Sequence, residues 1–315
     1  MEYRNLGRSG LKVSIVGLGC NNFGRRCDVD RTREVVHKAL DLGINLLDTA
    51  DIYGPGGLSE EFLGKAIEGK RHSVVLATKF AGPMGEGPMD SGASRNHIIA
   101  AAEASLRRLN TDYIDLYQVH FPDAKTPLDE TLRALDDLVR AGKVRYIGNS
   151  NFAGWQVAES HWIAKTNHFT PFISAQNQYN LLERNVEREL VPACNAYGLS
   201  ILPYFPLASG FLTGKYHKDQ PLPEGTRLGS PAAAPMASRI LNDANYEVLD
   251  RLEAFATARG HTMLELAIGW LASLPHVGSV IAGATRPEQV EQNAAAAAWK
   301  LTAEELAEVD TITKR

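Results

Sequence analysis

The sequence predicts an α/β fold, a (β/α)8 TIM barrel, on three observations. Eight short apolar segments alternate with helical patterns along 315 residues, and no linker, charge run or low-complexity stretch interrupts the series. A doubly wound sheet usually carries a GxGxxG fingerprint after its first strand, and Gly17-Leu18-Gly19-Cys20-Asn21-Asn22 lacks that spacing. We therefore expect residues 1–315 to form one barrel domain.

The predicted elements follow from short signals taken in order. A β-hairpin, residues 3–6 and 11–13 around a glycine-bounded turn, comes first and is expected to be a lid or plug. Gly43 ends the first helix, whereas Pro127 and Gly142 bracket the fourth. The predicted strands are 15–19, 44–47, 74–77, 113–117, 144–147, 172–175, 199–202 and 280–282. The predicted helices are 30–42, 59–67, 94–109, 127–141, 153–164, 186–197, 246–259, 262–274, 287–296 and 301–315, with a long loop from 206 to about 245.

Composition excludes several classes of function. A net charge of −4 and a pI of about 6.2 give no footprint for nucleic acid or an anionic membrane. The three cysteines match no metal spacing, and with no signal peptide they indicate free thiols in a reducing cytoplasm. No apolar run reaches the length of about 18 residues that spans a membrane.

Four ionisable residues stand at or just beyond the ends of predicted strands: Asp48, Tyr53, Lys79 and His120. A lone aspartate there is more often a helix cap, and a lone tyrosine more often part of the core. In a barrel, however, the carboxyl ends of all strands meet at one face, so the four side chains are expected to form one site.

Together these residues suit proton donation to a carbonyl. A phenol has a reference pKa of about 10, which a neighbouring lysine lowers, while an aspartate keeps the lysine charged and in place. We expect Tyr53 to be the general acid, assisted by Lys79 and Asp48, and His120 to hydrogen-bond the carbonyl oxygen.

At these residues the chain resembles the aldo-keto reductases. The resemblance runs nearly end to end and includes Asp48-Thr49-Ala50-Asp51-Ile52-Tyr53, Leu116-Tyr117-Gln118-Val119-His120 and the segment from Ala282 to Asn293. The residues of these motifs are more similar to those of the bacterial branch related to potassium-channel β subunits than to those of the aldose reductase branch. The resemblance implies NADPH-dependent, reversible reduction of aldehydes and ketones, with the four residues as the catalytic tetrad.

The resemblance also implies where the cofactor binds. Ser150, Asn151 and Gln176 are expected to hold the nicotinamide carboxamide and Tyr204 to stack on its ring. The turn from Gly283 opens a helix, a site for phosphate. The full expected set is Ser150, Asn151, Gln176, Tyr204, Pro206, Leu207, Gly283, Thr285, Arg286, Gln289, Gln292 and Asn293.

Preference for NADPH depends on Arg286, whose charge suits a 2′-phosphate. The better-known family pattern has Lys-Ser in this turn and arginine where this chain has Gln289. NADH therefore stays open as a second cofactor.

Substrate selection is expected in the loops that begin near Phe23, Phe80 and Phe121 and in the loop after Pro206. The chain shows no long aromatic tail of the kind that closes the pocket in other branches, which predicts a wide mouth. A monomer or small homo-oligomer is the expectation.

Two alternatives remain. The first is a protein that binds NADPH and reports its redox state to a partner, with slow chemistry of its own. The absence of a basic or disordered N-terminal extension counts against a dedicated channel partner. The second is a metal-dependent or Schiff-base enzyme that uses Lys79, which is disfavoured because Asp48 and His120 lack further ligands at metal spacing.

Overall fold

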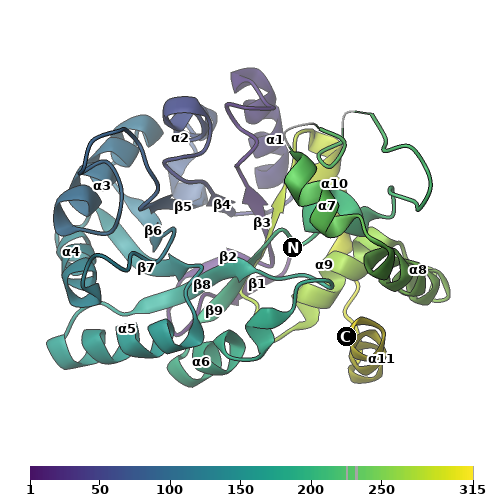
Figure 1. Cartoon of the computed structure of the whole chain (residues 1–315). Coiled ribbons are helices and arrows are strands. Elements are labelled where there is room, and N and C mark those ends of the chain that lie inside the picture. The colour runs from purple at the N-terminus through teal and green to yellow at the C-terminus, as the bar shows by residue number, and fades with distance from the viewer. Residues whose placement is uncertain (225, 231–232, 315) are drawn as a thin grey trace.

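A computed structural model describes residues 1–224, 226–230 and 233–314. Eight parallel strands form one sheet in the order β10-β3-β4-β5-β6-β7-β8-β9, surrounded by helices (Figure 1). At the seam between β9 and β10, the Gly278 N–H donates to the Ile201 carbonyl at 2.9 Å, so the barrel is nearly closed. The predicted fold class is confirmed.

The barrel strands are β3 (Val16–Gly19), β4 (Leu46–Asp48), β5 (Val75–Phe80), β6 (Ile114–Val119), β7 (Val144–Ser150), β8 (Phe172–Gln178), β9 (Ser200–Tyr204) and β10 (Val280–Gly283). The helices are α1 (Val29–Asp41), α2 (Leu58–Ala66), α3 (Arg95–Leu109), α4 (Leu128–Arg140), α5 (Gly154–Asn167), α6 (Leu190–Tyr197), α7 (Ala234–Ile240), α8 (Asp243–Thr257), α9 (Met263–Ser273), α10 (Pro287–Ala296) and α11 (Ala303–Thr313).

Helix starts follow the capping residues of the sequence. The Asp28 carboxylate accepts the Arg31 N–H at 2.8 Å at the start of α1. Thr262 and Glu265 form a reciprocal capping box at α9, and Thr302 and Glu305 form another at α11. Each cap satisfies N–H groups that a helix leaves without intrahelical partners, which fixes where the helix begins.

Five of the described strands extend two or three residues beyond their predicted ends. β5, β7 and β8 continue three residues past their predicted ends, to Phe80, Ser150 and Gln178. β6 and β9 continue two residues past theirs, to Val119 and Tyr204. The added residues include Lys79 and Gln118, which are buried polar side chains. Because both side chains hydrogen-bond Asp48 inside the barrel, polar residues occur where the prediction expected loop.

The hairpin β1 (Tyr3–Asn5) and β2 (Lys12–Ser14) closes the amino end of the barrel. Leu6 and Val13 are fully buried and pack in one cluster with Leu46, Val75 and other strand residues. The Arg4 guanidinium donates to carbonyls of 272, 274 and 277, just before β10, at 2.6 to 3.1 Å. The hairpin is therefore a plug opposite the carboxyl ends of the strands.

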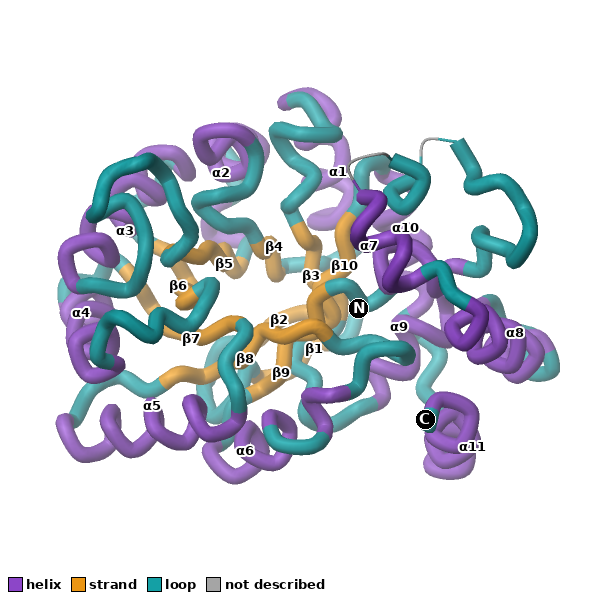
Figure 2. Tube along the Cα trace, in the orientation of Figure 1, coloured by secondary structure: helices purple, strands orange, loops and turns teal. Residues whose placement is uncertain are grey.

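The predicted loop from 206 to 245 contains more structure than expected. It holds a 3-10 segment, Ala208–Thr213, as well as α7, and α8 starts at Asp243 behind an Asn242 cap. The intervening connection extends away from the barrel beside α7 and α8 (Figure 2). Of this loop, residues 225, 231 and 232 lie outside the described part of the chain.

Candidate active site

Asp48, Tyr53, Lys79 and His120 come together at the carboxyl ends of the strands. The Lys79 ammonium donates to Asp48 Oδ2 at 2.6 Å and to the Thr49 carbonyl at 2.8 Å. Its Nζ atom lies 5.1 Å from the centroid of the Tyr53 ring. The Tyr53 and His120 ring centroids are 5.6 Å apart, with the rings nearly perpendicular. The expected cluster therefore exists as a geometry, and its catalytic roles stay predictions.

Asp48 is held from three further strands. Its Oδ2 atom binds Lys79 of β5, and its Oδ1 atom accepts from Gln118 of β6 at 3.1 Å and Gln176 of β8 at 2.8 Å. Sequence reasoning missed Gln118, although two-residue alternation back from His120 would have placed it on the same inner face. The Gln176 amide N–H, expected to face a cofactor, bonds Asp48 instead; its side chain still lines the cavity described below.

Burial and charge act against each other on Lys79 and Tyr53. Burial lowers the pKa of Lys79, but the Asp48 carboxylate and the Tyr53 phenol more than offset this, so the net pKa is raised and the lysine is charged. Burial raises the pKa of Tyr53, and the Lys79 ammonium only partly opposes it. The lysine does act in the predicted direction, but the net shift is upward because the phenol is taken out of water. Tyr53 therefore keeps its proton at neutral pH.

His120 is a neutral imidazole in this site. Burial, and then the charge of Lys79, lower its pKa to about 3. Its Nδ1 atom is buried without a hydrogen-bond partner among the described residues, and Phe121 stacks on its ring at 4.3 Å between centroids. A neutral imidazole can donate an N–H without placing another cation beside Lys79.

The charge state of His120 can be measured directly. Nitrogen-15 NMR of histidine-labelled protein is expected to show a neutral His120 ring at about pH 5, where a free imidazole with a pKa of about 6.5 is mostly charged. His120→Gln assigns the signal by removing it. A charged His120 ring at this pH would contradict the neutral state assigned to it.

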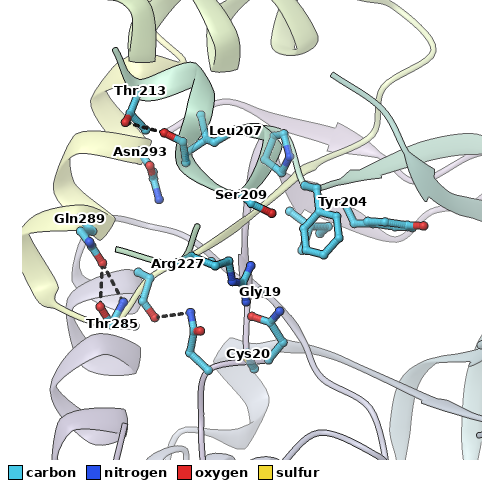
Figure 3. A pocket seen from close by; sticks show the side chains of 18 of the residues that line it. Gly19, Cys20, Tyr204, Leu207, Ser209, Thr213, Arg227, Thr285, Gln289 and Asn293 are labelled. Carbon is cyan, nitrogen blue, oxygen red and sulfur yellow. Dashed lines mark hydrogen bonds between the residues drawn. The ribbon is translucent and has the colours of Figure 1, made fainter. Parts of the chain in front are cut away.

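A cavity of about 1280 Å³ opens above these residues and is lined by Asp48, Tyr53 and His120. The residues that line it come from the end of β3, from β9 and α10, and from the long loop (Figure 3). All twelve residues predicted for cofactor binding line this cavity: Ser150, Asn151, Gln176, Tyr204, Pro206, Leu207, Gly283, Thr285, Arg286, Gln289, Gln292 and Asn293. Their spatial grouping is thus observed, while their role stays a prediction.

A chain of hydrogen bonds orders the polar side of the cavity. The Tyr204 hydroxyl donates to Asn151 Oδ1 at 2.8 Å, and the Asn151 amide donates to the His120 carbonyl at 2.9 Å and to Ser150 Oγ at 3.1 Å. Ser150 in turn donates to the Gln176 carbonyl at 2.7 Å. Asn151 has a positive φ of 62°, a conformation that asparagine tolerates better than most residues.

The turn after β10 ends at the start of α10. Arg286 is the N-cap residue of α10 and makes no side-chain capping bond. The Gln289 side-chain oxygen instead accepts the Thr285 N–H at 2.8 Å and its hydroxyl at 3.2 Å (Figure 3). Gln289 therefore shapes this turn. α10 begins at Pro287, which has no N–H, and has no side-chain cap.

Sequence reasoning missed two cations of the cavity, Lys215 and Arg227. Burial lowers the pKa of both side chains, and the charge of Arg26 lowers both further. At Lys215, the charge of Arg286 adds to this effect. The structure gives neither an ion pair among the described residues, although the acidic Glu224 and Glu265 also line the cavity. Both cations lie in or near the long loop, where no periodic pattern predicts which side chains turn inward.

Two of the three predicted substrate residues do not reach the cavity. Phe23 and Phe80 are fully buried in the hydrophobic core, and Phe80 packs on Tyr117 at 4.8 Å between ring centroids. Phe121 is 43% exposed and lines the cavity. An aromatic residue beside a strand end can equally well pack into the core, and Phe23 and Phe80 do so here.

Two features of the described residues bear on the alternatives. No group of three or more histidine, cysteine, aspartate or glutamate side chains is arranged to hold a metal ion within residues 1–224, 226–230 and 233–314. Over the same residues, every helix is too short or too polar to cross a membrane.

Comparison with known proteins agrees with this geometry. The sequence model of the Aldo/keto reductase family matches residues 15–314. The chain is 39% identical to a probable voltage-gated potassium channel subunit beta of Arabidopsis thaliana, over 93% of this chain and 90% of that protein. It is 36% identical to versiconal hemiacetal acetate reductase of Aspergillus parasiticus, over 97% and 95%. It is 34% identical to L-glyceraldehyde 3-phosphate reductase of Escherichia coli O157:H7, over 98% and 92%. The chain belongs to the aldo/keto reductase family and is an oxidoreductase that acts on carbonyl groups.

Proposed function

We propose that this protein reduces aldehydes or ketones to alcohols with NADPH, reversibly, and that Tyr53 is the proton donor. The observation that carries the proposal is a protonated phenol at the cavity floor, between a charged lysine and a neutral histidine. NADPH consumption measured across a panel of aromatic aldehydes, such as nitrobenzaldehydes, tests it.

The cavity suits NADPH in size and in charge. Its volume of about 1280 Å³ exceeds the range of about 300–1,000 Å³ usual for small-ligand sites. Lys215, Arg227 and Arg286 supply positive charge for the pyrophosphate and the 2′-phosphate, and the positive end of the α10 dipole adds to it. The mutual repulsion that lowers the pKa of Lys215 would be relieved by an anion. NADPH, when bound, supplies a hydride to the carbonyl carbon.

The residues of the chain do the remaining work. The neutral His120 donates a hydrogen bond that orients the carbonyl oxygen and stabilises its growing negative charge. Tyr53 transfers its hydroxyl proton to that oxygen, so the carbonyl becomes an alcohol and the phenol becomes a phenolate. Lys79, kept charged by Asp48, stabilises this phenolate until it regains a proton from solvent.

Arg286 is proposed to select NADPH over NADH. Arg286→Ala is expected to raise the KM for NADPH by about 10-fold or more, because a hydrogen bond to a charged group is worth about 1.5–3 kcal/mol. The KM for NADH should stay unchanged. Arg251→Ala, at an exposed position of α8 outside the cavity, is the matched control. An unchanged ratio of the two KM values would remove Arg286 as the selecting residue.

A second candidate function rests on the similarity to the channel subunit. In this reading the protein binds NADPH and reports its redox state to a partner, and its turnover is incidental. The aldehyde panel separates the two, because tight NADPH binding with negligible turnover on every carbonyl would favour the sensor.

A further inference from the structure

A second buried polar group lies on the outer side of the barrel wall, behind the tetrad. We call it the outer acid cluster; it consists of Asp51, Glu60, Thr78, Arg108 and Tyr117. Alternation along β5 and β6 turns Lys79 and Gln118 into the barrel, so Thr78 and Tyr117 face outward toward α2 and α3. Of the five residues, all except Arg108 are fully buried.

Glu60 forms an ion pair with Arg108, the one cation of the outer acid cluster. Its Oε2 atom accepts from Arg108 Nε at 2.7 Å, and Arg108 Nη2 also lies 2.7 Å from it. Its Oε1 atom accepts the Thr78 hydroxyl at 2.5 Å. Both carboxylate oxygens of Glu60 are thus satisfied, and the guanidinium is directed at Glu60.

Asp51 has no such partner. Its Oδ1 atom accepts the Ile52 N–H at 2.7 Å, but its Oδ2 atom is buried without a hydrogen bond among the described residues, as is the Tyr117 hydroxyl. An ionised Asp51 would be a second buried negative charge beside Glu60. Burial and then Glu60 raise the pKa of Asp51 to about 7, against the opposing effects of the Ile52 N–H, Arg108 and Lys79. Burial, and then Asp51 and Glu60, raise the pKa of Tyr117.

Asp51 lies in the segment that carries Tyr53. The Asp51 N–H donates to the Lys79 carbonyl at 3.1 Å, and the Thr49 N–H donates to the Ala77 carbonyl at 2.9 Å. The segment 49–53 is therefore bound by its backbone to β5. The Glu60 carboxylate of α2 acts electrostatically on the Asp51 carboxyl, so repulsion between the two carboxylates would act two residues from the phenol.

We propose that Asp51 is a positioning residue that is protonated in the active enzyme, and that loss of its proton to solvent displaces segment 49–53 and the Tyr53 phenol. The positioning role depends on the proposed function, because it acts through Tyr53. A protonated carboxyl carries no charge and is buried at lower cost, whereas the carboxylate is repelled by Glu60. Turnover should therefore fall as the pH rises through about 7.

Infrared spectroscopy tests the proton without any turnover. The spectrum of the wild type minus that of Asp51→Asn should contain the carbonyl stretch of a protonated carboxylic acid below about pH 7, and this stretch should disappear above it. Glu60→Gln should shift the disappearance to lower pH, because it removes the repelling charge. Asp115→Asn is the control, since Asp115 of β6 is paired with Arg71 away from the tetrad. No acid band in the difference spectrum would overturn the proposal.

Kinetics tests the positioning. Asp51→Asn, a neutral mimic of the acid, should keep kcat within about 3-fold at about pH 6 and should lack the fall near pH 7 seen in the wild type. The KM for NADPH should be unaffected, because the proposed cofactor residues lie on other strands. An acid band together with identical kcat profiles would overturn the positioning role. If every variant and the wild type bind NADPH but turn over no carbonyl, the proposed function fails and the positioning role fails with it, while the infrared band still decides the protonation.

A stability measurement covers the case in which Asp51→Asn folds poorly. The folded pKa of Asp51, about 7, lies above the unfolded value of about 3.9, so the folded state binds the proton more tightly. The stability of the wild type should thus contain a component that falls as the pH rises from about 4 to about 7. Glu60→Gln should confine that fall to a lower and narrower range; an unchanged range would count against the proposal.

Discussion

Replacing Tyr53 by phenylalanine should lower kcat for aldehyde reduction by about 100-fold or more, the scale expected for loss of a general acid. The change removes one hydroxyl and keeps the ring that contacts His120 and Lys79. NADPH binding, followed by quenching of protein fluorescence, should be nearly unchanged. Stopped-flow measurement of a single turnover separates the chemical step from product release.

Tyr204→Phe is the matched control for Tyr53→Phe. It also removes one phenolic hydroxyl from the cavity, but that hydroxyl bonds Asn151. We expect it to weaken cofactor binding more than it slows the chemical step. If both variants slow the chemical step equally, Tyr53 is not the proton donor.

Replacing Asp48 by asparagine should lower the free energy of unfolding by about 3–5 kcal/mol, the cost of removing one partner from a buried ion pair. Lys79 is fully buried and Asp48 nearly so. The substitution therefore leaves a buried ammonium without its counter-charge. Urea denaturation followed by circular dichroism measures the loss. kcat should fall as well, because an uncharged or displaced lysine cannot stabilise the phenolate.

The double variant Asp48→Asn with Lys79→Met separates folding from chemistry. It removes both charges, so part of the lost stability should return, whereas kcat should stay low. A double variant no more stable than Asp48→Asn alone would mean that the ion pair does not explain the stability of this region.

The barrel was predictable because its signals repeat. Each strand and helix unit carries its own apolar pattern and end signals, and an error at one boundary leaves the order of the others intact. The tetrad could be predicted for the same reason, since parallel strands bring their carboxyl ends to one face whatever their separation in sequence. That residues 1–315 form one domain stays a prediction.

The remaining features depend on packing that the sequence does not encode locally. Phe23 and Phe80 look the same in sequence as a cavity-lining aromatic such as Phe121, and only the folded structure shows that they are buried in the core. Lys215 and Arg227 turn into the cavity from irregular backbone, which has no period. The rise in the pKa of Tyr53 follows from desolvation, which depends on the whole environment of the phenol.

The bonds to Asp48 bear on how much the family motif can reveal about activity. One carboxylate joins β4 to β5, β6 and β8, so it holds these strands together as well as forming part of the site. A related protein that no longer catalysed a reaction would still be under selection to keep Asp48 and Lys79, because the pair stabilises the fold. The presence of this pair in a related sequence therefore indicates an intact barrel. Catalytic activity has to be inferred from Tyr53, His120 and the loops above them.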